Sequence, residues 1–162
     1  MYRFISILSF ISISHISFAE SYIGAGIGSN SSGSWDSSAS PEVWVGYRFG
    51  NKFALESSYI DLGQSESWTN ETISGISLDA VYIQSVTDKI SFSGSGGVYI
   101  YQQDYATGDY YASELEQGFS VVVSALYNFN TQFSVKLQAR KLLIDTYNDG
   151  PVRIVLGINY SF

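Results

Sequence analysis

The sequence predicts an all-β protein, an eight-stranded antiparallel up-and-down β-barrel that crosses a membrane. Apolar and polar residues alternate with a period of two in eight segments, the pattern of strands with one apolar face. The connections are alternately long and short, as expected when all short turns lie at one end of a transmembrane barrel. No apolar run reaches the about 20 residues of a transmembrane helix, so the apolar content is spread over strands.

Residues 1–19 have the features of a cleaved signal peptide. Arg3 is followed by a mostly apolar stretch, and Ser17 and Ala19 are small residues at the positions that a signal peptidase reads. We therefore expect cleavage after Ala19 and a single barrel domain over residues 20–162. Because the stretch also alternates in part, a first β-strand is the other interpretation.

The first four strands are bounded by residues that favour turns. SYIGAGIG precedes a Ser/Gly-rich loop, EVWVGYRF ends at the tight turn Gly50-Asn51-Lys52, and FALESSYIDL ends at a polar loop. A short turn at 87–89 ends the fourth strand. The expected strands are 21–28, 42–49, 53–62 and 75–86, with long loops at 29–41 and 63–74.

The last four strands follow the same rule. A long polar loop separates the fifth strand from the sixth, Asn130-Thr131 turns the sixth into the seventh, and a loop ending at Pro151 precedes VRIVLGINYSF. The expected strands are 90–101, 115–129, 132–144 and 152–162, with long loops at 102–114 and 145–151. An even number of strands places both ends of the barrel on the side of the short turns.

One face of each strand is apolar, and the opposite face is small or charged. A soluble barrel such as a lipocalin would bury the apolar face, whereas a membrane barrel turns it toward lipid. Two features favour the membrane barrel. Aromatic residues of the apolar face gather near the short turns, as in an interfacial girdle. The opposite face is rich in Gly and Ser, which fit the inside of a narrow barrel.

Charged residues of both signs lie on the small-residue face, where they could neutralise one another. They include Arg48, Glu56, Asp79, Lys136, Arg140 and Arg153. We expect Glu56 to pair inside the barrel with either Arg140 or Lys136, and removing one partner of such a buried pair costs roughly 3–5 kcal/mol. On a soluble sheet the same residues would be solvated charges that matter little for stability.

Several stretches resemble the OmpA-like transmembrane domain, a superfamily of eight-stranded outer-membrane barrels. VWVGYRFGNKFALESSYIDLG resembles its second hairpin, YIGAGIG its first strand and INYSF its last strand. The residues that match the hairpin pattern are Gly46, Tyr47, Glu56, Tyr59, Leu62 and Gly63. Gln138 departs from the family, which often has an inward Glu in this strand. The size is that of the OmpX/Ail group of small barrels.

The last strand is predicted to close the barrel. It must pair with SYIGAGIG, because an open strand edge in lipid leaves backbone groups without hydrogen bonds. Its even-numbered residues would then face lipid, with Tyr160 and Phe162 at the periplasmic interface. The resemblance implies that Tyr160 and Phe162 form the signal that the barrel-assembly machinery reads.

The residue inventory excludes several classes of function. A net charge of −7 without a basic patch argues against nucleic-acid binding. The chain has no Cys, and its only histidine, His15, lies in the predicted signal peptide. The mature chain therefore lacks a Ser-His-Asp triad and His metal ligation, which argues against an enzyme, including the outer-membrane palmitoyltransferase family. We expect no cofactor and no metal.

The predicted long loops carry acidic and aromatic residues but no Lys or Arg. The simplest interpretation is a solvated rim. The alternative is a recognition surface on a rigid scaffold, with Trp35, Trp68, Tyr105, Tyr110, Tyr111 and Tyr147 as its candidate residues. Divalent cations could bridge the carboxylates to lipopolysaccharide phosphates.

The sequence thus predicts a monomeric barrel in the outer membrane of a Gram-negative cell, exported by its signal peptide. We expect a structural or surface-interaction role. Its expected partners are outer-membrane lipid, lipopolysaccharide, the barrel-assembly machinery and an unidentified extracellular ligand. Two alternatives remain: a narrow channel for small solutes, and a soluble periplasmic lipid-binding barrel. Side chains just fill the interior of an eight-stranded barrel, which argues against a general porin.

Overall fold

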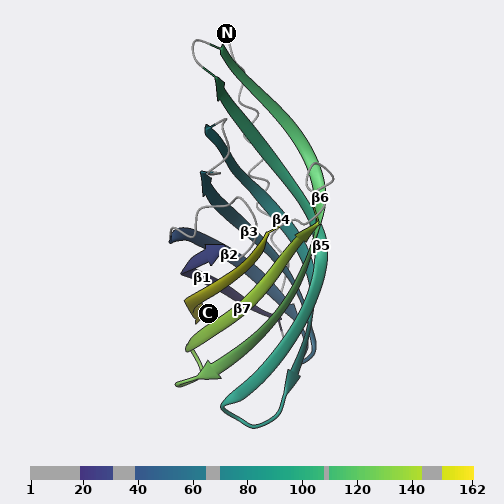
Figure 1. The fold of residues 1–162 in the computed structure, drawn as a ribbon. Coiled ribbons are helices and arrows are strands. Elements are labelled where there is room, and N and C mark those ends of the chain that lie inside the picture. The colour runs from purple at the N-terminus through teal and green to yellow at the C-terminus, as the bar shows by residue number, and fades with distance from the viewer. Residues whose placement is uncertain (1–18, 31–38, 65–69, 108–109, 144–150) are drawn as a thin grey trace.

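The computed structural model shows a closed barrel of eight antiparallel strands (Figure 1). It describes residues 19–30, 39–64, 70–107, 110–143 and 151–162, so the predicted signal peptide up to residue 18 lies outside the described residues. The strands are β1 (Ala19–Asn30), β2 (Ser40–Phe49), β3 (Phe53–Gln64), β4 (Asn70–Ser85), β5 (Ile90–Thr107), β6 (Tyr110–Asn128), β7 (Phe133–Leu143) and β8 (Val152–Ser161). The predicted fold class is confirmed.

The last strand closes the barrel against the first. β8 pairs with β1 from Tyr22 opposite Ser161 to Asn30 opposite Arg153. The amide of Phe162 donates to the carbonyl of Ser21 at 2.9 Å, which extends the ladder by one residue. The predicted pairing of the final segment with SYIGAGIG is therefore confirmed. We call the barrel end with the β2–β3, β4–β5 and β6–β7 connections the turn end, and the opposite end the loop end.

The apolar faces of the strands point outward. Along β8, Ile154, Leu156 and Ile158 are exposed, while Arg153, Val155 and Asn159, at the alternate positions, are buried. The same alternation holds for the other strands, whose exposed side chains are mostly Ile, Leu, Val, Phe and Tyr. This is the inverse of a soluble barrel and matches a barrel whose outer surface contacts lipid. Among the described residues, no helix has the length and apolar content needed to cross a bilayer.

Aromatic rings surround the turn end, as predicted. Ring pairs lie 4.8–5.5 Å apart between centroids, and they are Tyr47–Phe49, Phe53–Tyr82, Tyr127–Phe129, Phe133–Tyr160 and Tyr160–Phe162. Amphipathic rings favour the boundary between lipid and water, so this girdle marks the membrane interface at the turn end. Gly50, with φ of 66°, provides the left-handed residue of the tight β2–β3 turn.

Two of the predicted long loops are wrong. The expected loop 102–114 is β-ladder, since β5 pairs with β6 as far as Thr107 opposite Tyr110. The expected loop 63–74 is shorter, because β3 continues to Gln64 and β4 begins at Asn70. Polarity marks where a strand leaves lipid, but a polar strand can continue into water because its backbone groups pair with a neighbour. Tyr and Thr, frequent in this part of the chain, also favour strands.

Candidate functional site

The inside of the barrel pairs large side chains with glycines on neighbouring strands. Tyr22 lies over Gly46 so closely that a Cβ atom there would overlap its ring, and Trp44 excludes a side chain at Gly24 and Gly157 in the same way. Trp44 is 1% exposed, and its indole N–H donates to Asn159 Oδ1 at 2.5 Å. These glycines therefore let aromatic residues enter a narrow interior.

Glu56 pairs with Lys136 in the structure. The Lys136 ammonium lies 2.7 Å and 2.9 Å from the two carboxylate oxygens of Glu56, and Tyr22 donates its hydroxyl to the same carboxylate at 2.9 Å. Lys136 Nζ also lies 4.6 Å from the centre of a Trp44 ring, within the range of a cation–π contact. All four side chains are buried.

Arg140 lies with other acids. Its guanidinium donates to Asp79 Oδ2 at 2.9 Å and to Glu42 Oε1 at 3.3 Å, and no ion pair joins it to Glu56 among the described residues. Asp79 also accepts hydrogen bonds from the hydroxyls of Ser77 and Ser120. Small hydroxyl side chains thus donate further hydrogen bonds to the carboxylate of this buried ion pair.

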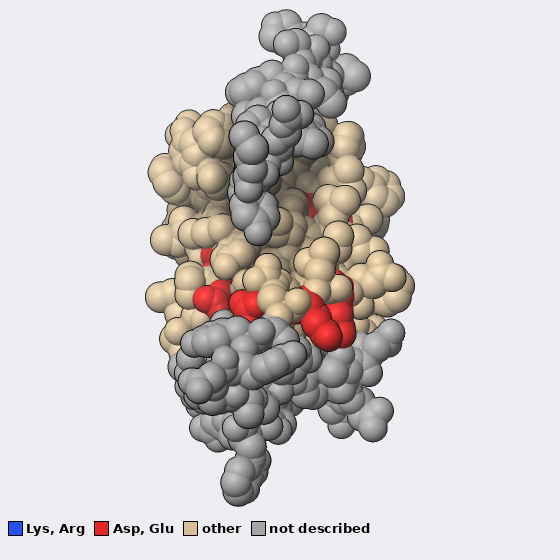
Figure 2. Space-filling model, turned by 90° about the horizontal axis from the view of Figure 1, so that it is seen from above, with Lys and Arg blue, Asp and Glu red and all other residues tan. Residues whose placement is uncertain are grey.

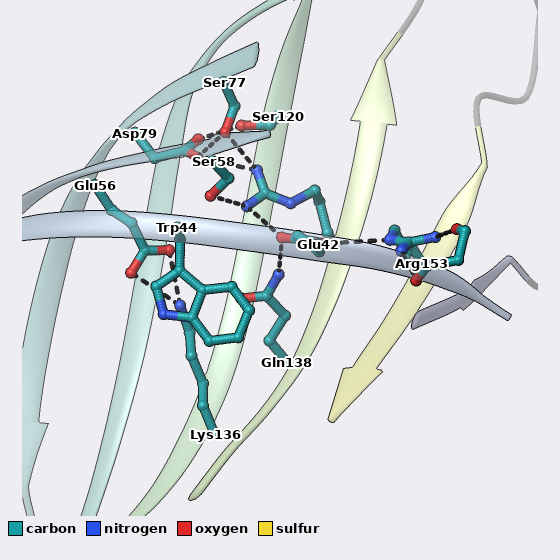
Figure 3. A network of polar contacts seen from close by, with 12 residues as sticks. Glu42, Trp44, Glu56, Ser58, Ser77, Asp79, Ser120, Lys136, Gln138 and Arg153 are labelled. Atoms are coloured by element: carbon teal, nitrogen blue, oxygen red, sulfur yellow. Dashed lines mark hydrogen bonds and ion pairs between the residues drawn. The ribbon is translucent and has the colours of Figure 1, made fainter. Parts of the chain in front are cut away.

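Glu42 accepts hydrogen bonds from three side chains of two strands (Figure 3). Arg153 Nε donates to Oε2 at 3.0 Å, Gln138 Nε2 donates to Oε1 at 2.7 Å, and Arg140 donates to the same Oε1. Gln138, which departs from the family pattern, is therefore a neutral donor to an acid on β2. A Glu at this position would bring a second negative charge against Glu42.

Formal charge balances in this lumen network, which we define as Glu42, Glu56, Asp79, Lys136, Arg140 and Arg153 with their hydrogen-bond partners. The three acids and three bases cancel, and each of the six residues is at most 5% exposed. Buried ions are tolerated only when they are paired and their remaining hydrogen-bonding atoms are mostly satisfied. The network therefore fixes which strands face one another across the barrel.

The lumen is filled to different degrees along its length. At the loop end, Ile60, Leu62, Ile73, Tyr99, Tyr101 and Leu142 form an apolar cluster in which every side chain is at most 1% exposed. At the turn end lies a cavity of about 500 Å³, with Tyr22, Glu56 and Lys136 in its wall and Lys89 and Asn130 near the turns. Along β7 the order is Leu142 of the apolar cluster, then Arg140, then Lys136 in the cavity wall, so the lumen network extends from the cluster to the cavity.

Several contacts of the lumen network could not be predicted from the sequence. Asp79 and Arg153 are recognisable as charges on the inward face, but Glu42 lies at the start of its strand, beside Pro41. Trp44 and Tyr22 belong to the same inward face of small residues, and only the glycines opposite them signal their place. The partners of Glu42 lie 96 to 111 positions away along the chain, so they depend on the register of the whole barrel.

The predicted recognition residues lie in different parts of the chain. Trp35, Trp68 and Tyr147 lie outside the described residues. Tyr105, Tyr110 and Tyr111 belong to the paired strands β5 and β6, which corrects their assignment to an irregular loop.

The described part of the loop end is mostly acidic, although the half-buried Lys141 lies near the end of β7. Figure 2, seen from the side toward which the β5–β6 hairpin rises in Figure 1, shows acidic side chains and no Lys or Arg among the described residues in view. Exposed or half-buried acids of the outer strand halves are Asp61, Asp104, Glu114 and Glu116. Nowhere in the described ranges do three or more His, Cys, Asp or Glu side chains gather in a way that could hold a metal ion.

A family model for the outer membrane protein beta-barrel domain matches residues 5–162. The chain belongs to this family. Its outward apolar surface, turn-end girdle and closed eight-stranded ladder are those of an outer-membrane barrel. No curated protein sequence matches the chain.

Solved structures share the fold at low sequence identity. The attachment invasion locus protein Ail of Yersinia pestis is 18% identical over 90% of this chain and 99% of its own, with a TM-score of 0.64. The N-terminal β-barrel domain of OprF from Pseudomonas aeruginosa is 16% identical over 88% and 97%, with a TM-score of 0.68. Neisserial surface protein A is 14% identical over 89% and 97%, with a TM-score of 0.68. At these identities the likeness establishes the fold.

Proposed function

We propose that this outer-membrane barrel is a non-enzymatic surface-interaction protein, and that the outer half of its β5–β6 hairpin binds a basic, extended partner. One observation carries the proposal. β6 pairs with β5 from Tyr110 onward, whereas among the described residues its ladder with β7 begins at Phe119, opposite Leu143 at the end of β7. The outer part of β6 therefore extends beyond the described end of β7 (Figure 1).

The side chains on this part of β6 suit a protein partner. Leu115 is 76% exposed, and Glu114 beside it is exposed as well. An exposed sheet margin can add an extended segment of another chain by backbone pairing, and neighbouring side chains then give specificity. The acidic surroundings favour a partner rich in Lys or Arg.

The charge proposed for the ligand of this chain differs from that of a ligand bound by Ail, a protein of similar fold. Ail of Yersinia pestis has been solved in complex with the heparin analogue sucrose octasulfate, a polyanion. The described loop-end acids of this chain would repel such a ligand. We therefore propose that this chain, unlike Ail, binds a positively charged ligand. We further propose that the barrel is a monomer inserted by the barrel-assembly machinery into a bilayer containing lipopolysaccharide.

Binding to a basic peptide tests the proposal. The full barrel in a lipid nanodisc is titrated with a fluorescent oligolysine peptide, and fluorescence anisotropy reports binding. We expect measurable, salt-sensitive affinity that falls in an Asp104→Asn/Glu114→Gln variant, since both acids are exposed and each removed charge weakens attraction at low ionic strength. Leu115→Ser should weaken binding without changing its salt dependence.

Asp88→Asn is the matched control, because it removes one acid from the exposed turn of the opposite barrel end. It should bind the peptide as the wild type does. Equal binding by the wild type and the Asp104→Asn/Glu114→Gln variant would refute a specific role for the hairpin.

A further inference from the structure

A groove of about 440 Å³ lies in the lipid-facing surface over β3, β4 and β5. Ala80, Gly94 and Gly96 give it a floor of small residues, and Phe53, Leu55 and Tyr82 stand beside them. The strand register places these residues next to one another, with Tyr82 opposite Gly94 and Ala80 opposite Gly96. On β6 the neighbours across the ladder are Val123 and Val121, both exposed. The groove is therefore a hollow in a belt of large apolar side chains.

Local geometry does not require glycine at 94 or 96. A Cβ atom at Gly94 would meet nothing within 4 Å, and one at Gly96 would meet only a carbonyl oxygen at 3.7 Å. Neither residue has a positive φ. Glycine in a strand interior costs roughly 0.5–1 kcal/mol relative to alanine. The two glycines thus carry a cost without a backbone or packing reason, and what they create is the hollow.

The groove lies near the turn end, which faces the periplasm in barrels of this class. Its floor begins two residues beyond Phe92 on β5, and one wall is the Phe53–Tyr82 pair of the aromatic girdle. The leaflet on this side of an outer membrane consists of phospholipids. A phospholipid acyl chain therefore passes at the depth of the groove.

Polar groups stand where the headgroup of such a lipid would be. Lys52 is exposed and directly precedes Phe53, and its carbonyl accepts the amide of Ile83 at 2.7 Å, which holds this residue beside β4. Gln84 is exposed on the same outward row as Tyr82 and accepts its hydroxyl at 3.2 Å. Lys52 and Gln84 lie on the turn-end side of the apolar groove. They complement the phosphate and glycerol of a lipid whose acyl chain lies in the groove.

We propose that this groove binds one phospholipid of the periplasmic leaflet, with an acyl chain over Gly94 and Gly96 and the phosphate beside Lys52. The charge argues against a second copy of the chain as the occupant. A two-fold axis along the membrane normal would place the same patch on both copies, so the two Lys52 side chains would approach each other at the same depth. A lipid instead provides the opposite charge and fills the hollow.

Native mass spectrometry of the full chain in detergent tests the proposal. Purified, delipidated protein is titrated with dioleoylphosphatidylglycerol, and the population carrying one bound lipid is measured. In a Gly94→Val/Gly96→Val variant we expect this affinity to fall about tenfold, equivalent to a loss of about 1.4 kcal/mol. The added side chains enter open space, so the variant should fold, which heat-modifiable migration in a detergent gel checks.

Two further variants separate the groove from general lipid contact. Ala25→Val enlarges an exposed lipid-facing residue of β1, away from the groove, and should leave binding unchanged. Lys52→Gln should weaken binding several-fold while the groove stays open. Equal lipid affinity in wild type and the Gly94→Val/Gly96→Val variant would overturn the proposal. So would a dimer of the wild type that this variant abolishes, since the groove would then hold a second copy.

Discussion

Glu42 is the residue on which two buried guanidinium groups depend. It accepts from Arg153 at 3.0 Å and from Arg140 at 3.3 Å, and all three side chains are 0% exposed. Glu42→Gln leaves a surplus of positive charge inside the barrel while preserving side-chain shape. We expect it to lower the free energy of unfolding by about 3–5 kcal/mol, as when one partner of a buried ion pair is removed. Urea unfolding in detergent micelles, followed by tryptophan fluorescence, measures the change.

Glu20→Gln provides the control for this variant. Glu20 pairs with Arg48 at 2.9 Å, but their side chains are 33% and 29% exposed at the turn end. Solvent screens such a pair, so its loss should cost less than about 1 kcal/mol. A loss of similar size in both variants would mean that the lumen network contributes no more than an exposed pair.

Variants of the Glu56–Lys136 pair test whether the stability lost on removing one charge depends on the charge of its partner. Lys136→Met leaves Glu56 with the Tyr22 hydroxyl as its hydrogen-bond donor among the described side chains, whereas Glu56→Gln/Lys136→Met removes both charges. We expect the double variant to be more stable than Lys136→Met alone, because replacing both charges removes the uncompensated one. Thermal unfolding of the two variants and the wild type checks the order. The reverse order would show that the Glu56 carboxylate needs no cation.

Part of this arrangement of buried charges can be predicted from the sequence. The parity of Glu56, Lys136 and Arg140 places them on the inward face, because side chains alternate along a strand. Which acid meets which base depends on the register of several strand pairs, and a shift by one residue would turn a side chain to the other face. Arg140 therefore could be placed inside the barrel but not with Asp79 and Glu42.

Among the elements, β8 closes the barrel, and experiment can separate this closure from a proposed role of its end in assembly. Phe162 is 74% exposed, and in the fold it contributes a backbone hydrogen bond to Ser21 and a ring contact with Tyr160. We propose that Tyr160 and Phe162 are also read by the assembly machinery. Phe162→Ala should then reduce the amount of folded barrel in cells far more than it reduces refolding of purified chain in detergent.

Phe133→Ala is the matched variant, since it removes another ring of the same girdle, also in contact with Tyr160. Its yield in cells should change only as much as its refolding yield does. If Phe162→Ala behaves in the same way as Phe133→Ala, the terminal ring has no role in assembly beyond the fold.

The lengths of β5 and β6 show what limits prediction of elements. Alternation between apolar and polar residues identifies all eight strands, because it reports the lipid-facing face directly. Beyond Tyr101 the outward residues become Gln102 and Asp104, so the apolar signal stops while the ladder continues. Where a strand ends in water depends on its pairing with neighbouring strands. This pairing cannot be predicted from the composition of one segment.

In the whole molecule, closure of the barrel and filling of its interior decide whether solutes can pass. The described lumen has a cavity of about 500 Å³ at the turn end, and the side chains of the loop-end cluster are at most 1% exposed. A hydrated ion crossing it would have to break several of the buried ion pairs and displace Tyr99 and Tyr101, which stack 5.4 Å apart. Each broken pair leaves charges in a low-dielectric interior, at a cost of several kcal/mol.

We therefore expect no reproducible single-channel conductance from the wild-type barrel in planar bilayers at neutral pH. Tyr99→Gly/Tyr101→Gly/Arg140→Ala removes the stacked rings of the loop-end cluster and one guanidinium of the lumen network, and it should raise the frequency of current steps if it inserts equally well. Because insertion must be shown independently, protease protection of the reconstituted protein accompanies each recording. Steady conductance by the wild type would instead establish the narrow channel, and would require the lumen network to rearrange under voltage.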